Sequence, residues 1–70
     1  MYYYYVRFSI FVEGTSVKIT DGRMQVVMPE EITDISQIEM IEQEIIKKTK
    51  IPSNFYPLVD FYHLLRKDPN

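Results

Sequence analysis

The side chains that most often carry out chemistry in enzymes are scarce in this chain. It has a single histidine, His63, and no cysteine, so nucleophilic catalysis would need that one imidazole beside a serine or threonine. His63 lies in an apolar run, which is more typical of a partly buried histidine with one hydrogen-bond partner than of a general base. Glu39, Glu42 and Glu44 fall on a predicted helix surface, where carboxylates are solvated, whereas acid–base catalysis by paired carboxylates needs a cleft.

Metal and phosphate sites are not predicted either. With one histidine and no cysteine the chain lacks the usual ligands of zinc, and it has no loop organised for calcium or magnesium. Gly14 and Gly22 are its only glycines, so it has no glycine-rich phosphate loop. A chain of 70 residues also has little room for a ligand pocket, whose volume is typically roughly 300 Å³ or more. We therefore expect no catalytic residues, no metal, no cofactor and no enzymatic activity.

The remaining candidates for function are aromatic residues near the start of the chain. The sequence opens MYYYYVRFSIFVE, with four consecutive tyrosines followed by residues that alternate in polarity. In a strand, successive side chains point to opposite faces, so this segment places aromatic residues on both. Burial in a core explains the aromatic residues on the face with Tyr4 and Phe8. The aromatic residues on the face with Tyr3, Tyr5 and Arg7 need a different explanation.

Size and charge limit the classes of protein that this chain can represent. With 46% hydrophobic and 14% aromatic residues it is expected to fold as one domain, residues 1–70, close to the size at which a single core is marginal without a partner subunit. Its net charge of −2 disfavours general nucleic-acid binding. It has no signal-peptide pattern and no apolar stretch near the roughly 18 residues that cross a bilayer, so we expect a cytoplasmic protein without membrane contact.

Two strands are predicted in the first half of the chain, at residues 2–13 and 17–28, with a turn at Gly14. The apolar pattern of the second strand changes phase in its middle. A bulge near Asp21-Gly22 would bring its apolar residues onto one face, and these are Val17, Ile19, Met24, Val26 and Met28. A second hairpin turn at Asp21-Gly22 is the alternative.

A helix is predicted over residues 34–50. Asp34 can cap its first N–H groups, and Gln37 stands where the partner in a capping box would be. The helix should end by Lys50, because a proline at position 52 disfavours a helical conformation at the residue before it. Glu42 intrudes on its apolar stripe, which consists of Ile35, Ile38, Ile41, Ile45 and Ile46.

The last apolar segment, FYPLVDFYHLLRK, is compatible with a strand or with a helix that begins at Pro57. Its centre is poor in strong helix formers, and an exposed two-stranded sheet needs a third strand for stability, so a strand at residues 57–66 is favoured. The predicted fold is α+β, in the order β-β-α-β. It has a three-stranded antiparallel-type sheet with one helix on one face. A second helix across the opposite face is the alternative.

The helix and the final strand also carry a resemblance. The stretch EITDISQIEMIEQEI, followed after a loop by VDFYHLLR, resembles the later part of very short proteins encoded by bacteriophages and prophages. Those proteins open with a β-hairpin and close with an apolar strand, and several of them inhibit bacterial immune systems, the anti-Hachiman protein among them. The resemblance implies an inhibitor that binds and blocks an anti-phage defence protein in the cytoplasm of the host cell.

If one helix covers one face of the sheet, the other face holds a second apolar patch. Tyrosine and arginine together are the composition that the cores of protein interfaces favour, and exposed apolar patches of this size normally mark a partner. The interface residues that the sequence predicts are Tyr3, Tyr5, Arg7, Phe11, Val27, Leu58, Tyr62 and Leu64.

Three uses of this patch remain open from the sequence. The first is a homodimer that packs sheet face on sheet face, and the second is a host defence protein bound by the patch or by an edge strand. The third is a platform for single-stranded nucleic acid, with Tyr3, Tyr5 and Phe11 stacking on bases and Arg7 with Lys18 contacting phosphate, which the acidic balance disfavours. We expect a homodimeric binding module that acts as an inhibitor, with a purely structural homodimer as a further alternative.

Overall fold

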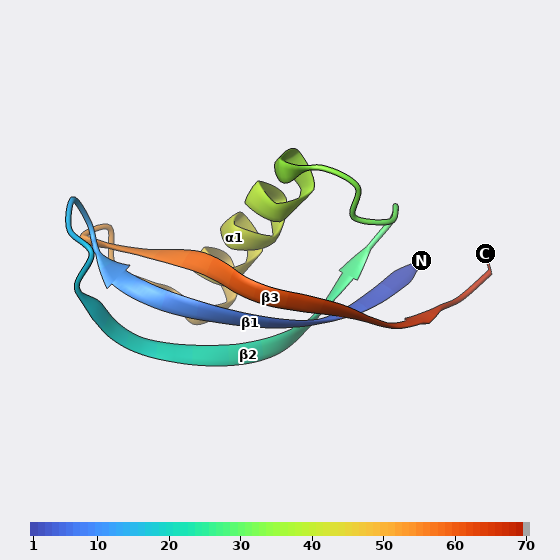
Figure 1. The fold of residues 1–70 in the computed structure, drawn as a ribbon, viewed down its shortest axis with the longest axis horizontal. Coiled ribbons are helices and arrows are strands. Elements are labelled where there is room, and N and C mark those ends of the chain that lie inside the picture. Colours follow the sequence, from blue (N-terminus) through green and yellow to red (C-terminus); the bar gives the residue numbers. More distant parts are fainter. Residues whose placement is uncertain (70) are drawn as a thin grey trace.

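The computed structural model describes residues 1–69 and has the element order β-β-α-β (Figure 1). Three antiparallel strands form one open sheet in the spatial order β2-β1-β3, and α1 lies on one side of it. The predicted α+β class is therefore confirmed, and the final apolar segment is a strand and not a second helix. The elements are β1 (Tyr2–Val12), β2 (Lys18–Met28), α1 (Ile35–Thr49) and β3 (Phe55–Lys67).

A tight turn joins β1 to β2. Gly14 has φ 78°, a left-handed conformation that glycine adopts without the steric cost of a Cβ atom. The Thr15 hydroxyl donates to the Val12 carbonyl at 2.9 Å and accepts from the Val17 N–H at 3.1 Å. The Tyr56 hydroxyl of β3 donates to the Thr15 carbonyl at 2.9 Å, so the turn is also attached to the other edge of the sheet.

The core lies between α1 and the side of the sheet that faces it. Tyr4 is buried there, and its hydroxyl accepts a hydrogen bond from the Ile32 N–H at 2.9 Å, which satisfies the polar end of the ring. Ile41 and Ile45 are the buried residues of the helix. The complete buried cluster consists of Tyr4, Val6, Phe8, Val26, Met28, Ile41 and Ile45.

Both ends of α1 are capped by local contacts. Asp34 is the N-cap and Gln37 completes a capping box, as the sequence predicts, while Lys50 ends the helix in a left-handed conformation with φ 53°. The predicted apolar stripe is correct at its centre but wrong at Ile35, which is 75% exposed. The first turn of α1 rises away from the sheet (Figure 1), which agrees with the exposure of this side chain.

The irregularity in β2 lies closer to the turn than predicted. The register shifts between Ile10 and Phe11 of β1, which pair with Thr20 and Lys18, so the extra residue is Ile19 and the predicted bulge at residues 21–22 is wrong. Nor does the shift bury the first apolar residues of the predicted strand, since Val17, which precedes β2, and Ile19 remain 58% and 53% exposed. This end of the sheet extends beyond α1 (Figure 1).

Gly22 instead has a packing role. It pairs with Phe8, and a Cβ atom added at position 22 would lie 2.9 Å from Cζ of the Phe8 ring, which is closer than carbon atoms tolerate. Glycine therefore leaves the space that a buried phenylalanine ring occupies on the neighbouring strand.

We expect Gly22→Ala to destabilise the protein by about 1–3 kcal/mol in urea unfolding, because the buried ring must move. In a Phe8→Leu background, which removes the ring, the same change should cost clearly less. An equal cost in both backgrounds would contradict the proposed contact between position 22 and the ring.

The Asp34 cap predicts that the stability of the folded protein depends on pH. The Ser36 hydroxyl and then the Ser36 N–H donate to the Asp34 carboxylate, and these bonds lower the pKa of Asp34 below its ordinary value. A lowered pKa in the folded state means that the cap stabilises the protein above the ordinary value and that this contribution is lost as pH falls.

The difference in Tm between wild type and Asp34→Ala should therefore be constant above about pH 5 and should shrink as pH falls below about 4. Asp34→Asn provides the control, since asparagine caps helices but does not titrate. The difference in Tm between Asp34→Asn and Asp34→Ala should not change over the same pH range. A wild-type curve parallel to that of Asp34→Asn would rule out the carboxylate as the titrating cap.

Candidate binding surface

The side of the sheet that faces away from α1 carries a continuous surface, which we call the open face. Side chains directly opposite in an antiparallel ladder share a face, so the register defines its members. Five come from β1 and are Tyr3, Tyr5, Arg7, Ser9 and Phe11. Their partners on β2 are Val27, Gln25, Arg23, Asp21 and Lys18, in that order. Their partners on β3, in the same order, are Arg66, His63, Phe61, Leu58 and Tyr56.

The predicted patch is only partly assembled on this face. Two register shifts in the pairing of β1 with β3 leave Asp60 and Leu65 as extra residues. Because a one-residue shift reverses the direction of the following side chains, Tyr62 and Leu64 pair with Val6 and Tyr4 on the side of the sheet that faces α1. The placement of Tyr62 and Leu64 on the open face was therefore wrong. The other predicted members do share it.

Two side chains hold the irregular part of β3 in place. The Glu42 carboxylate of α1 accepts a hydrogen bond from the Val59 N–H at 3.0 Å. On the opposite side, the Ser9 hydroxyl donates to the Asp60 carboxylate at 2.5 Å, which satisfies a buried serine. The intrusion of Glu42 on the apolar stripe thus has a structural explanation, since it binds a backbone N–H next to the bulge.

Several open-face rings already contact other side chains of the chain. Phe11 stacks on Tyr56 with ring centroids 5.6 Å apart, and the Arg66 guanidinium lies 4.0 Å from the centre of the Tyr3 ring. The hydrogen bond with Tyr3 and then the charge of Asp68 raise the pKa of Arg66. Tyr5 makes neither kind of contact within residues 1–69.

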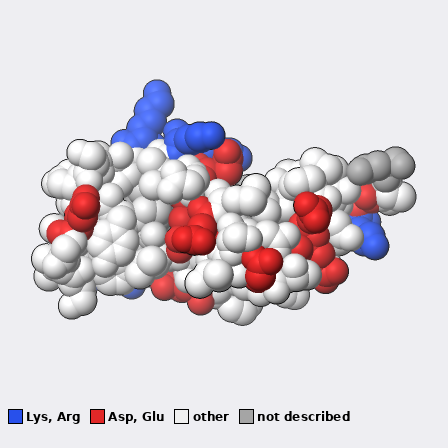
Figure 2. Space-filling view, turned by 90° about the horizontal axis from the view of Figure 1, so that it is seen from above, with Lys and Arg blue, Asp and Glu red and all other residues white. Residues whose placement is uncertain are grey.

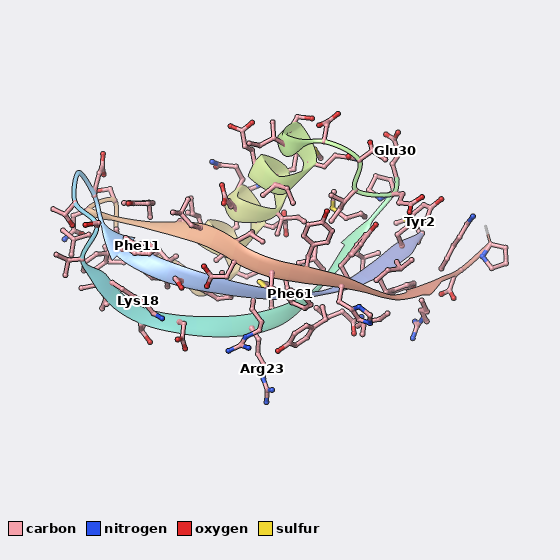
Figure 3. The ribbon with its side chains drawn as sticks, viewed as in Figure 1. Tyr2, Phe11, Lys18, Arg23, Glu30 and Phe61 are labelled. Atoms are coloured by element: carbon pink, nitrogen blue, oxygen red, sulfur yellow. The ribbon has the colours of Figure 1, made fainter. Side chains whose placement is uncertain are left out.

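Two arginines meet at the middle of the open face. Arg7 and Arg23 pair directly across β1 and β2, and Phe61 of β3 pairs with Arg7 on its other side. Like charges in opposed positions destabilise a sheet, and neither guanidinium forms an ion pair with another described residue. Figure 3 shows Arg23 extending away from the sheet on the side opposite α1. The two arginines border a shallow hollow of about 380 Å³, lined by Tyr5, Arg7, Asp21, Gly22 and Arg23.

The acidic side chains are concentrated elsewhere. Among the described residues, the open face has two acidic side chains. Asp21 forms a salt bridge with Lys18 at 3.0 Å, and the bulge residue Asp60 accepts the hydrogen bond from Ser9. Figure 2 shows the α1 side of the molecule, where acidic atoms are spread across the surface and most basic atoms gather along its rim. Most acidic residues of the chain lie between β2 and the end of α1, and these are Glu30, Glu31, Asp34, Glu39, Glu42 and Glu44.

Metal-ligand clusters and membrane-spanning helices are absent from the described residues. Among residues 1–69, no three histidine, cysteine, aspartate or glutamate side chains are grouped as metal ligands would be. In the same part of the chain, no helix has the length and apolar character of a membrane span. Comparison with protein-family models, with curated proteins and with solved structures found no match to this chain.

Sequence reasoning missed several members of the open face, among them Arg23, Phe61 and His63. Phe61 and His63 were not among the predicted interface residues, because strand alternation places them on the face opposite Leu58 and the shift at Asp60 reverses that direction. Arg23 was not selected either. In the strand alternation it points away from the face of Met24, Val26 and Met28, which could have placed it with Val27. The charge pattern along β2 was a sequence signal for Arg23. The bulge in β3 has no corresponding signal in the sequence, so the positions of Phe61 and His63 were not predictable.

We expect Glu42→Ala to destabilise the protein by about 1–3 kcal/mol, because it leaves the half-buried Val59 N–H without its charged acceptor. Glu39→Ala removes an exposed carboxylate from the same helix and should change the free energy of unfolding by less than about 0.5 kcal/mol. Urea unfolding measures both. Equal effects would show that the hydrogen bond from Val59 does not stabilise the bulge.

Proposed function

We propose that this protein is a non-enzymatic binding module whose open face docks on an acidic surface of a partner protein. The observation that carries the proposal is the opposed pair Arg7 and Arg23, exposed and without an ion pair among the described residues. A carboxylate supplied by a partner would relieve their mutual repulsion and accept bidentate hydrogen bonds from a guanidinium.

The surroundings of the arginine pair support a protein as the partner. Tyr5 and Phe61 flank it, and Val27 and Leu58 add exposed aliphatic surface on the two outer strands. Aromatic rings and arginine with few acidic residues are characteristic of the centres of protein interfaces. The strands curve around α1, so the open face is convex and suits a broad surface better than an enclosed small molecule (Figure 1).

The class of partner follows from the resemblance of residues 31–45 and 59–66 to short phage proteins. We propose a bacterial anti-phage defence protein as the target, with inhibition by occlusion of an acidic functional surface. The protein then contacts its target through the open face, and α1 with its acidic side chains faces solvent in the complex.

Single-stranded nucleic acid is the second candidate. The row Arg23, Arg7 and Phe61, next to Tyr5 and His63, alternates cations with rings that could stack on bases. Against it stand the net charge of −2 and the rings of Tyr3 and Phe11, which already contact Arg66 and Tyr56.

The test is capture of partners by the tagged protein from bacterial lysate, with and without nuclease, followed by binding measurements on purified variants. Arg7→Glu/Arg23→Glu should weaken binding of the captured protein by about tenfold or more, because both changes place carboxylates against an acidic surface. Lys47→Glu/Lys48→Glu alters the net charge equally on α1 and should retain binding. Equal loss in both variants would contradict docking through the open face, and capture that depends on intact nucleic acid would favour the second candidate.

A further inference from the structure

The outer edge of β3 has no partner strand among the described residues, because the sheet ends there in the order β2-β1-β3. The second half of this strand exposes apolar side chains on both sides of the sheet. Phe61 on the open face is 51% exposed, Tyr62 and Leu64 on the α1 side are 42% and 37% exposed, and Leu65 at the bulge is 50% exposed. A long apolar edge of this kind is a template for another strand.

We propose that this edge pairs in antiparallel fashion with the same edge of a second copy, which joins the two sheets into one. A partner that docked on the open face alone would leave Tyr62 and Leu64 uncovered, since they lie on the other side of the sheet. A strand added at the edge covers neighbours on both sides, because its own side chains alternate between the two faces.

The charges of β3 complement those of an antiparallel copy. Asp60 lies toward the start of the strand, whereas Arg66 and Lys67 lie at its end. Antiparallel pairing about a two-fold axis at His63 brings Asp60 of each copy near Arg66 of the other. The same register pairs Tyr62 with Leu64 on the α1 side, which is a like-face, apolar pair.

The other surfaces of the sheet suit a second copy less well. The β2 edge carries Lys18, Asp21, Arg23 and Gln25 along its length, and charged side chains on an edge disfavour strand pairing. Stacking two open faces near their centres would place the arginine pairs of the two copies against each other, where like charges repel. Joining the β3 edges avoids this and leaves both open faces on the same side of the extended sheet, so the dimer remains compatible with the proposed partner surface.

Because the chain contains no cysteine, single introduced thiols can map the contact. His63 and Gln25 both pair with Tyr5, on the open face, but from opposite edges of the sheet. His63→Cys and Gln25→Cys are therefore matched. Each is treated with a bifunctional thiol reagent that spans roughly 8 Å, the reach of direct and diagonal cross-strand neighbours.

We expect covalent dimers of the full chain from His63→Cys and almost none from Gln25→Cys. Cross-linking of both variants would instead support stacked open faces, and cross-linking of Gln25→Cys alone would support a β2 edge. Absence of cross-linking in both would overturn the proposal. These outcomes concern only contacts between copies, so they are independent of whether an acidic partner protein is found.

Light scattering supplies the second measurement. Leu65→Lys should shift the protein from dimer to monomer, whereas Val27→Lys, which charges a similarly exposed aliphatic position on the other edge strand, should leave a dimer. Circular dichroism verifies that each variant is folded. A folded Leu65→Lys variant that keeps the mass of the wild-type dimer, or a monomeric wild type, would overturn the proposal.

Discussion

One helix can cover only one face of a three-stranded sheet, and most features of this protein follow from that constraint. Tyr4, Val6 and Phe8 lie beneath α1 and form the core with Ile41 and Ile45. The same strand, β1, has neighbours on both edges, so its backbone is fully used in the sheet while half of its side chains face away from the helix. Residues 1–69 contain no further helix or strand that covers them, which makes the second face available for a partner.

The bulge at Asp60 decides which residues of β3 reach that second face. Glu42 of α1 accepts the Val59 N–H, and Ser9 of β1 donates to Asp60, so the irregularity is held from both sides of the sheet. Beyond it the direction of the side chains is reversed, which places Phe61 and His63 on the open face. A helix residue therefore shapes a surface that it does not touch.

The charge distribution separates the two sides of the molecule. The chain is acidic as a whole, with a net charge of −2, yet arginines predominate at the centre of the open face, and many acidic side chains lie between β2 and the end of α1. Net charge alone would therefore misrepresent the potential that a partner meets at this surface. Long-range attraction of an acidic partner depends on the local field, which falls off over about 8–10 Å at physiological ionic strength.

The sequence by itself determined the elements and their order. Alternating aromatic residues predicted β1, Asp34 with Gln37 predicted the start of the helix, and the proline at position 52 predicted its end, because these signals act within a few residues. Tyr3, Tyr5, Arg7 and Phe11 share one face of β1 for the same reason, because strand alternation is local. The sequence also indicated that Glu42 departs from the apolar stripe.

Only the tertiary structure decided what depends on contacts between distant strands. The extra residues Ile19, Asp60 and Leu65 are defined by pairing with β1, and they set the direction of every side chain that follows. The inclination of α1 left Ile35 exposed, and the space required by the Phe8 ring explains Gly22. Arg7 and Arg23 are far apart in the chain, and antiparallel pairing alone brings their charges together, since register is a property of two strands and not of either one.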